Sequence, residues 1–231
     1  MKWMKYGITL SRITEDDIEL VRYWRNKPDI KNTMLYRKYI SKAQQKKWFK
    51  SVNNNNNYYY LIIHRNEKIG LIYNKNVESL DSSSEAGIFI WNDEHDFVPF
   101  LASLLLCEIG FYVLFGGDSY IKVLRSNDRA MDYNLLLGYE IIEDDPKLDY
   151  IKMRLTRDLF KNATEKIRKT VLINTKSDGR LFLYLEKHDY ESGLAAMMER
   201  MYIDPVVAVA PESVDRVEED GTVIYSGIPN I

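Results

Sequence analysis

The chain has 231 residues, of which 45% are hydrophobic and 29% charged, and this is typical of a globular protein with one domain and an addition, or with two small domains. Its formal charge of -2 provides no basic field, so the composition does not support a nucleic-acid partner. Cys107 is the only cysteine, which excludes an internal disulfide framework. Met1–Gly7 contains no apolar run of the kind that a secretory signal needs, and the expected location is the cytoplasm.

The first part of the sequence carries strand and helix signals in turn. Gly7–Ile13 predicts a strand. Acidic residues directly after Thr14 indicate a helix that Thr14 caps and Pro28 ends, and Ser41–Val52 predicts a second helix. Three strands separated by turn-forming residues are then expected, namely Tyr58–His64, Lys68–Asn74 and Ala86–Trp91.

The most apolar segment, Phe97–Phe115, contains a single charged residue, Glu108, and is long enough to cross a bilayer. A carboxylate in the middle of such a span costs on the order of a few kcal/mol in lipid, and the flanks supply no Lys or Arg. A helix that is apolar on all sides also suits the centre of a layered domain. We therefore expect a buried helix and no membrane contact.

The segments after this helix complete one structural unit. Ser119–Leu124 predicts a strand, and Asn127 and Gly138 suit the N-cap and the C-cap of a short helix. Tyr139–Glu143 and Tyr150–Thr156 predict two more strands. The order of elements predicts an α/β fold with a mixed sheet of the α+β type and helices on both of its faces.

Residues 165–231 are expected to form a small α+β C-terminal appendage on a main domain of residues 1–160. Lys169–Asn174 and Leu181–Leu185 are strand-like, and Tyr190–Tyr202 predicts a helix with a stripe of methionines on one face. An appendage of this size is marginal as an independent fold, so it should dock on the main domain or on a second subunit. A homodimer therefore stays open.

The order of elements up to about residue 156 resembles the GNAT superfamily of acyl-CoA-dependent N-acyltransferases. The segment "ITEDDIELVRYWRNKPDI", with Trp24, Arg25 and Asn26, is similar to the first helix of the branch that contains ribosomal-protein N-acetyltransferases and bacterial amino-sugar N-acyltransferases. "EAGIFIW" resembles the fourth strand of that branch, and "NDRAMDYNLLLGYE" resembles its late helix and the strand that follows.

The resemblance implies that acetyl-CoA, or another acyl-CoA, is the co-substrate. Asn127 would hydrogen-bond the pantetheine arm, or cap its helix, or do both. Arg125, Arg129 and the amides at the start of the apolar helix, Phe97 and Val98, would receive the phosphates.

Two departures from the family pattern stand out. Relatives carry a glycine-rich loop before the buried helix, whereas this sequence has "EHDFVP" with no glycine. Many relatives also have a Tyr in the late helix as the acid that protonates the leaving thiolate. Asn134 occupies that position here, with Tyr133 one residue earlier, and an Asn can hydrogen-bond sulfur but has no proton to give.

Amide formation from a thioester requires a group that takes the proton of the amine, and Glu85 or His95 could do so directly or through water. The backbone amide of Phe89 or Ile90 would hold the thioester oxygen at a bulge in the strand. Trp24, Arg25 and Asn26 would line the acceptor cleft, or form no more than the end of a helix.

We therefore expect a transferase that moves an acetyl or short acyl group to a primary amine in a ternary complex. A nucleotide-linked amino sugar is the preferred acceptor, and a peptide or protein N-terminus is an alternative. The rival interpretation is a GNAT-shaped binding module without catalysis, which the missing glycines suggest. Three widely spaced histidines and a lone cysteine indicate no metal site.

Overall fold

A computed structural model of the chain describes residues 1–77, 83–92, 97–114, 116–200 and 215–228. Its strands are β1 (Lys2–Lys5), β2 (Ile8–Arg12), β3 (Tyr58–His64), β4 (Glu67–Lys75), β5 (Ser84–Ile90), β6 (Ser119–Leu124), β7 (Glu140–Glu143), β8 (Tyr150–Leu155), β9 (Leu181–Leu185), β10 (Asp215–Glu219) and β11 (Thr222–Gly227). Its helices are α1 (Ile18–Arg25), α2 (Pro28–Lys31), α3 (Lys42–Val52), α4 (Val98–Glu108), α5 (Asp128–Leu137), α6 (Arg157–Thr175) and α7 (Lys187–Glu191). A π-helical turn, Ile109–Leu114, continues α4.

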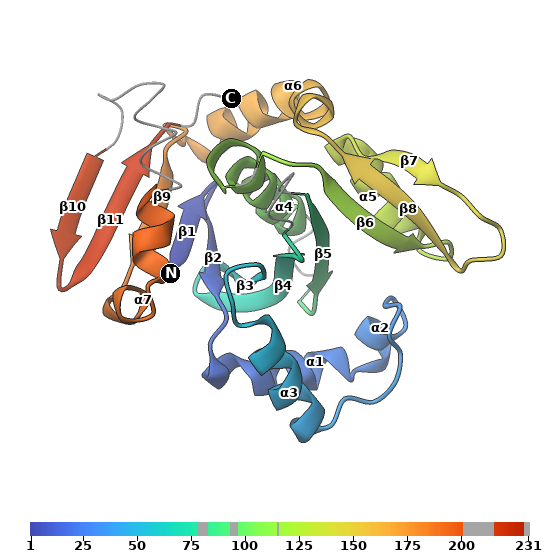
Figure 1. Cartoon of the computed structure of the whole chain (residues 1–231). Coiled ribbons are helices and arrows are strands. Elements are labelled where there is room, and N and C mark those ends of the chain that lie inside the picture. Colours follow the sequence, from blue (N-terminus) through green and yellow to red (C-terminus); the bar gives the residue numbers. More distant parts are fainter. Residues whose placement is uncertain (78–82, 93–96, 115, 201–214, 229–231) are drawn as a thin grey trace.

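All of these strands belong to one sheet in the order β10-β11-β9-β1-β2-β3-β4-β5-β6-β8-β7 (Figure 1). β5 and β6 pair in parallel, while the other neighbouring strands of the described sheet pair antiparallel. The expected α/β fold with a mixed sheet is therefore confirmed.

The central strands supply one core on each face, because successive side chains of a strand point to opposite sides. Tyr59 and Leu61 of β3 pack with α1 and α3, whereas Tyr60 and Ile62 pack in the core that contains α4. Figure 1 shows α1, α2 and α3 together on one side of the sheet and α4 and α6 on the other. A helix that is buried all round suits this central position, and α4 is such a helix.

The C-terminal residues extend the sheet. β9 pairs with β1, and Leu183 lies opposite Trp3. Leu181, Leu183, Met198 and Val223 belong to the same hydrophobic core as the α4 side chains. The expectation that this segment docks on the main domain is therefore confirmed, and the expected boundary between residues 160 and 165 falls inside the continuous helix α6.

Two details of the sequence analysis were wrong. Lys169–Asn174 is the last part of α6 and not a strand, because Phe160 and Val171 bury one face of a 19-residue helix that Thr156 caps. The first helix does end before Pro28, as expected, and Pro28 then opens the short helix α2 as its first residue. The helix expected at Tyr190–Tyr202 is divided at Gly193, whose φ of 75° is left-handed.

The charge within the apolar segment is compensated inside the protein. Glu108 is fully buried, and its carboxylate accepts a hydrogen bond of 2.5 Å from the Tyr6 hydroxyl and lies 2.8 Å from the ammonium of Lys5. Burial and this carboxylate raise the pKa of Tyr6 above its usual range. None of the helices in the described part of the chain combines the length and the apolar composition needed to cross a bilayer.

Substitution of Phe160 by Ala tests whether α6 belongs to the folding core. Phe160 is fully buried, and its ring lies 5.6 Å from that of Phe111 in the turn that continues α4. We expect the Phe160→Ala variant to lose about 3–5 kcal/mol of the free energy of unfolding in a denaturant titration. Ile173→Ala is the matched control on the same helix, because Ile173 is 76% exposed. Equal stabilities of the two variants, or a separate early transition of the C-terminal segment, would contradict a shared core.

Candidate active site

The sheet opens between β5 and β6. In the described part of these strands, pairing is limited to Ser84 with Ser119 and Glu85 with Tyr120. β5 stays paired with β4 along its whole length, and β6 stays paired with β8. The two central strands therefore diverge beyond Glu85, and one edge of β5 faces the opening.

The register of β5 decides which of its amides face this opening. Trp91 donates its backbone N–H to Ile69 of β4, and in an antiparallel ladder every second residue makes such a pair. Phe89 therefore faces β4, whereas Ile88 and Ile90 direct their backbone groups toward β6. Ser84 lies an even number of residues before Ile88 and Ile90 and therefore faces the same way. Its backbone N–H donates to the carbonyl of Asp118 beside β6, which supports this assignment. Ile90 is thus the better of the two expected oxyanion donors.

The expected bulge in this strand was wrong. β4 and β5 pair without a register shift, and the described irregularities lie between Ile62 and Ile63 in β3 and between Ile141 and Glu143 in β7. The open edge of β5 results from the departure of β6.

A small pocket of about 40 Å³ lies in this opening on the side of α4 and α5. Its walls come from the ends of β4, β5 and β6, from the middle of α4 and from α5. The lining includes Asn74, Ser84, Ile88, Ser103, Cys107, Ser119, Ile121, Tyr133, Asn134 and Tyr139. We call it the donor-side pocket. It is mainly apolar, with a small number of hydroxyl and amide groups, as is typical of ligand sites.

Hydroxyl groups form two buried pairs in the donor-side pocket. The Tyr133 hydroxyl lies 2.8 Å from the carbonyl of Pro99 and 2.5 Å from the hydroxyl of Ser103. The hydroxyls of Tyr139 and Ser119 lie 2.9 Å apart. Burial raises the pKa of both tyrosines, so both phenols keep their protons at neutral pH.

The neighbouring polar groups of the pocket are less suited to proton transfer. Asn134 donates its side-chain amide to the carbonyl of Ala130 at 2.6 Å, so this N–H is already used within α5. Burial raises the pKa of the Cys107 thiol to about 12, and the thiol therefore stays protonated and unreactive. Of the two expected acids, Tyr133 is the residue with a proton to donate.

The start of α5 combines two of the expected features. The side-chain oxygen of Asn127 accepts the N–H of Ala130 at 3.1 Å and caps the helix. The cap leaves the side-chain N–H₂ of Asn127 able to donate elsewhere. Gly138 ends α5 with a φ of 97°, and a Cβ there would lie 2.8 Å from the carbonyl oxygen of Leu159 in α6. The N-cap and C-cap predictions are confirmed.

Arg125 is engaged in the turn between β7 and β8. Its guanidinium donates to the carbonyls of Leu148 and Asp145 and lies 2.5 Å from the carboxylate of Asp144. The expected contact of Arg125 with CoA stays a prediction. Arg129 lies in the first turn of α5, and its phosphate role stays a prediction.

The start of α4 lies at Phe97 and Val98. Phe97 is the N-cap residue with 54% of its surface exposed, and Pro99 occupies the first turn. The amides of a helix start suit an anion, so a role for these two residues stays a prediction. His95 lies outside the described residues.

Glu85 occupies the point where β6 leaves β5, on the face opposite to the donor-side pocket. Its carboxylate lies 2.9 Å from the ammonium of Lys75, and both side chains are about 30% exposed. It lines a second, open pocket of about 220 Å³ with Asn76, Ser83, Ser84, Tyr120, Ile121, Lys122 and Lys152. We call this the acceptor-side pocket. Both pockets contain Ser84 and Ile121, so they meet where the two strands separate.

The three expected acceptor residues of α1 divide into two groups. Trp24 stacks on Trp91 at 6.0 Å, and the Arg25 guanidinium lies 5.4 Å above the ring of Phe89, so both side chains cover the end of β5. Asn26 instead makes two hydrogen bonds with the backbone of Ile40, at 2.8 and 2.9 Å. The amide of Asn26 therefore anchors the loop before α3, and its role in the acceptor cleft stays a prediction.

Sequence reasoning missed Tyr73 of β4, which pairs with Gly87 of β5, between Glu85 and Phe89. A Cβ at Gly87 would lie 2.3 Å from the Tyr73 hydroxyl, so the glycine makes room for this ring. Glu85 and burial raise the pKa of Tyr73 to about 12, burial being the larger cause, while Arg25 acts in the opposite direction. Gly87, a glycine inside a strand of otherwise larger side chains, was the sequence signal that a bulky group of the neighbouring strand lies against β5.

Among the residues that the structure describes, no group of three or more His, Cys, Asp and Glu side chains is arranged to hold a metal ion.

Several solved structures share this architecture. FdhC, a nucleotide-linked sugar GNAT, matches with a TM-score of 0.61 and 22% identity over 74% of this chain and 98% of its own. Spermidine N-acetyltransferase from Vibrio cholerae, in complex with CoA and spermine, has a TM-score of 0.61 and 14% identity over 68% and 99% of the two chains. The Campylobacter jejuni N-acetyltransferase PseH has a TM-score of 0.51 and 18% identity over 65% and 99%.

No family model matches the sequence, and no curated protein matches it by sequence. The similarity is therefore one of three-dimensional structure, and it includes nearly the whole length of each of these three proteins. The chain has the fold of the GNAT N-acetyltransferases.

Proposed function

We propose that this protein transfers an acetyl or short acyl group from acyl-CoA to a primary amine. The observation that carries this proposal is the meeting of two pockets from opposite faces of the sheet at Ser84 and Ile121, beside Glu85. A thioester in the donor-side pocket and an amine in the acceptor-side pocket would then approach each other through the opening between β5 and β6. Both substrates would be bound at the same time, as a ternary complex requires.

The open edge of β5 supplies the groups that a pantetheine arm needs. The arm contains amide bonds, and the backbone groups of Ile88 and Ile90 can pair with them as a further strand would. The Ile90 amide is also able to hold the thioester oxygen as negative charge develops on it. Asn127 can add one hydrogen bond to the arm without giving up its cap.

The phosphates of CoA would lie near the first turn of α4. The absence of glycines in "EHDFVP" removes the close backbone approach that a pyrophosphate cradle uses, so affinity depends on the helix-start amides and on Arg129. We expect a dissociation constant of roughly 10–100 μM at low salt, weakening as salt increases.

The proton transfers follow from the same geometry. The amine nitrogen forms a bond to the thioester carbon, and its proton passes to Glu85 directly or through water. The carbon–sulfur bond then breaks. The thiolate can leave unprotonated, since a free thiol has a pKa near 8.5, and the Tyr133 hydroxyl, which keeps its proton, can hydrogen-bond the sulfur.

A nucleotide-linked amino sugar is the acceptor that we favour. FdhC is a nucleotide-linked sugar GNAT, whereas the Vibrio cholerae enzyme acts on spermidine.

The Asn127→Asp variant separates the two roles of Asn127. Aspartate caps a helix as well as asparagine does, but it lacks the N–H₂ donor. We expect an unchanged melting temperature and a CoA affinity that falls roughly threefold to tenfold, the value of one hydrogen bond. Calorimetry with CoA, beside a thermal melt, measures both quantities. Wild-type CoA affinity in the variant would show that Asn127 is only a cap, and no binding of CoA to the wild-type protein would favour the non-catalytic module.

The Glu85→Gln variant tests the proton acceptor. Glutamine keeps the size and polarity of the side chain but cannot take a proton, so kcat should fall roughly 10²- to 10⁴-fold at neutral pH with CoA affinity retained. Glu140→Gln is the control, because Glu140 is also ion-paired, with Arg154, but lines neither pocket. A decrease below threefold for Glu85→Gln in a steady-state assay would assign the proton transfer to another group.

A further inference from the structure

Arg25 is a half-buried cation without a carboxylate partner among the described residues. Its Nη2 atom makes a long hydrogen bond of 3.5 Å to the carbonyl of Tyr36. Its Nη1 atom is buried with no hydrogen-bond partner in the described part of the chain. Burial lowers the pKa of Arg25, so the protein holds this charge at some expense of stability. Buried polar groups that lack partners are rare in folded proteins and call for an explanation.

Several other cations near this face are paired with carboxylates. Lys75 pairs with Glu85 and Lys152 with Glu143, while Arg22 pairs with Glu19 on the same helix as Arg25. Each of these cations has a nearby carboxylate that offsets its charge. Arg25 differs from them, because its guanidinium lies over the ring of Phe89 and the group that acts electrostatically on its charge is Tyr73, not a carboxylate.

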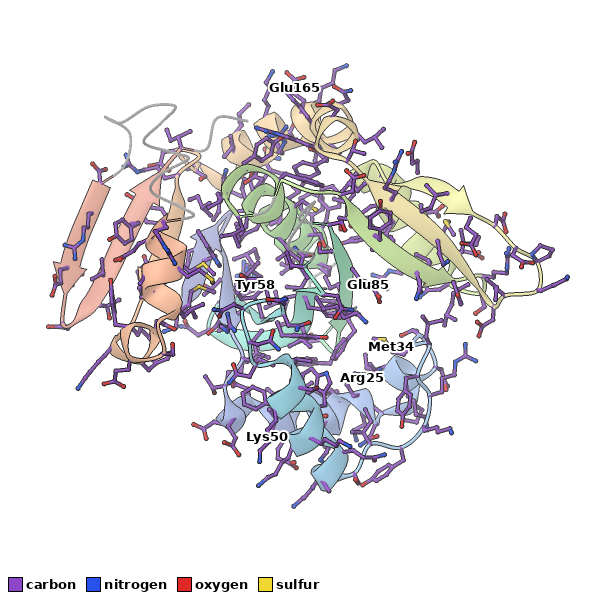
Figure 2. The ribbon with its side chains drawn as sticks, in the orientation of Figure 1. Arg25, Met34, Lys50, Tyr58, Glu85 and Glu165 are labelled. Atoms are coloured by element: carbon purple, nitrogen blue, oxygen red, sulfur yellow. The ribbon has the colours of Figure 1, made fainter. Side chains whose placement is uncertain are left out.

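The surroundings of Arg25 are strongly basic. Residues 22–50, which contain the end of α1, α2 and most of α3, carry ten basic side chains and one acidic side chain, Asp29, although the whole chain has a charge of -2. Arg37 in the loop after α2 lies 4.0 Å from Asp149 at the start of β8, so this basic layer reaches across to the strands of the acceptor-side pocket. In Figure 2, Arg25 and Met34 of the helical layer and Glu85 of β5 lie around the same region.

Tyr73 lies within electrostatic reach of both ends of this region, since, beside the larger effect of burial, Glu85 raises the pKa of Tyr73 and Arg25 lowers it. Glu85 suits the amine of an acceptor, and Arg25 suits an anion on the same molecule. A polyamine would place its second cation in a field that repels it.

We propose that Arg25 binds a phosphate ester of the amine acceptor, and that it selects phosphorylated amines, such as nucleoside-diphosphate amino sugars, over polyamines. The planar guanidinium matches the geometry of phosphate oxygens, and the basic layer favours a group with more than one negative charge. This proposal rests on the proposed acyltransferase function and names the acceptor class of the same site.

The Arg25→Met variant tests the proposal, because methionine keeps an unbranched apolar stem and removes the charge. With acetyl-CoA as donor, we expect the KM for a uridine-diphosphate amino sugar to rise roughly 10- to 100-fold, the value of a charged hydrogen bond, with kcat changed by less than about threefold. The KM for the same amino sugar without phosphate should not change. Arg22→Met is the matched control, and it should change neither KM, since Arg22 is paired with Glu19.

Two further measurements test the contact between Arg25 and the phosphate. Arg25→Lys retains the charge but loses the planar fork, so its KM should lie between those of the wild type and Arg25→Met. Calorimetry with uridine diphosphate, in the absence of any donor, should give heat with the wild type and none with Arg25→Met, with melting temperatures confirming that both are folded.

The possible results separate this proposal from the proposed function. Uridine diphosphate that binds through Arg25 supports the anion site even when no amine is acylated. Equal KM increases for phosphorylated and unphosphorylated amines would overturn it. Preference of the wild type for spermine, or the absence of any heat with uridine diphosphate, would also overturn it.

Discussion

The divergence of β6 from β5 is the constraint on which the rest of the site depends. It is tolerated because each strand keeps a complete partner on its other side, β4 for β5 and β8 for β6. The groups left without a sheet partner are the alternate amides and carbonyls of β5, and buried backbone groups of this kind are costly unless something pairs with them. An extended ligand with amide bonds is the natural partner.

A second requirement is that α4 be buried on every side. The sheet covers one side of it, α5 contacts it through the bond between Tyr133 and Pro99, and α6 covers it through Phe160. The C-terminal segment therefore completes the environment that α4 needs, and it also pairs with β1 at the edge of the main sheet. The burial of Glu108 is possible because Lys5 and Tyr6 of this same edge meet its carboxylate. The position of the donor-side pocket thus depends on residues far from it in the sequence.

Much of the fold could be predicted from the sequence, because strands with alternating or continuous apolar residues and clear turns have a strong local signal. The bounds of Tyr58–His64, Ser119–Leu124 and Leu181–Leu185 were predicted as the structure has them. The second half of α6 was not, because "RKTVLINT" is rich in β-branched residues, and its helical state comes from tertiary burial of Val171.

The site shows the same division between local and long-range signals. The caps at Asn127 and Gly138 are local and were predictable. The bonds that occupy Arg125 and Asn26 join residues 14 to 23 positions apart, and no pattern in the sequence reveals them. The lack of a carboxylate partner for Arg25 among the described residues is likewise visible only in the folded structure.

Amide hydrogen exchange at β5, followed residue by residue by NMR, tests the central claim most directly. The account predicts that Phe89 is protected in the free protein, whereas Ile88 and Ile90 exchange rapidly and become protected when CoA is added. Protection of Ile88 and Ile90 before any ligand is present would mean that the strands are closed. Unchanged exchange at both residues under saturating CoA would mean that the arm does not bind along β5, and either result would contradict the account.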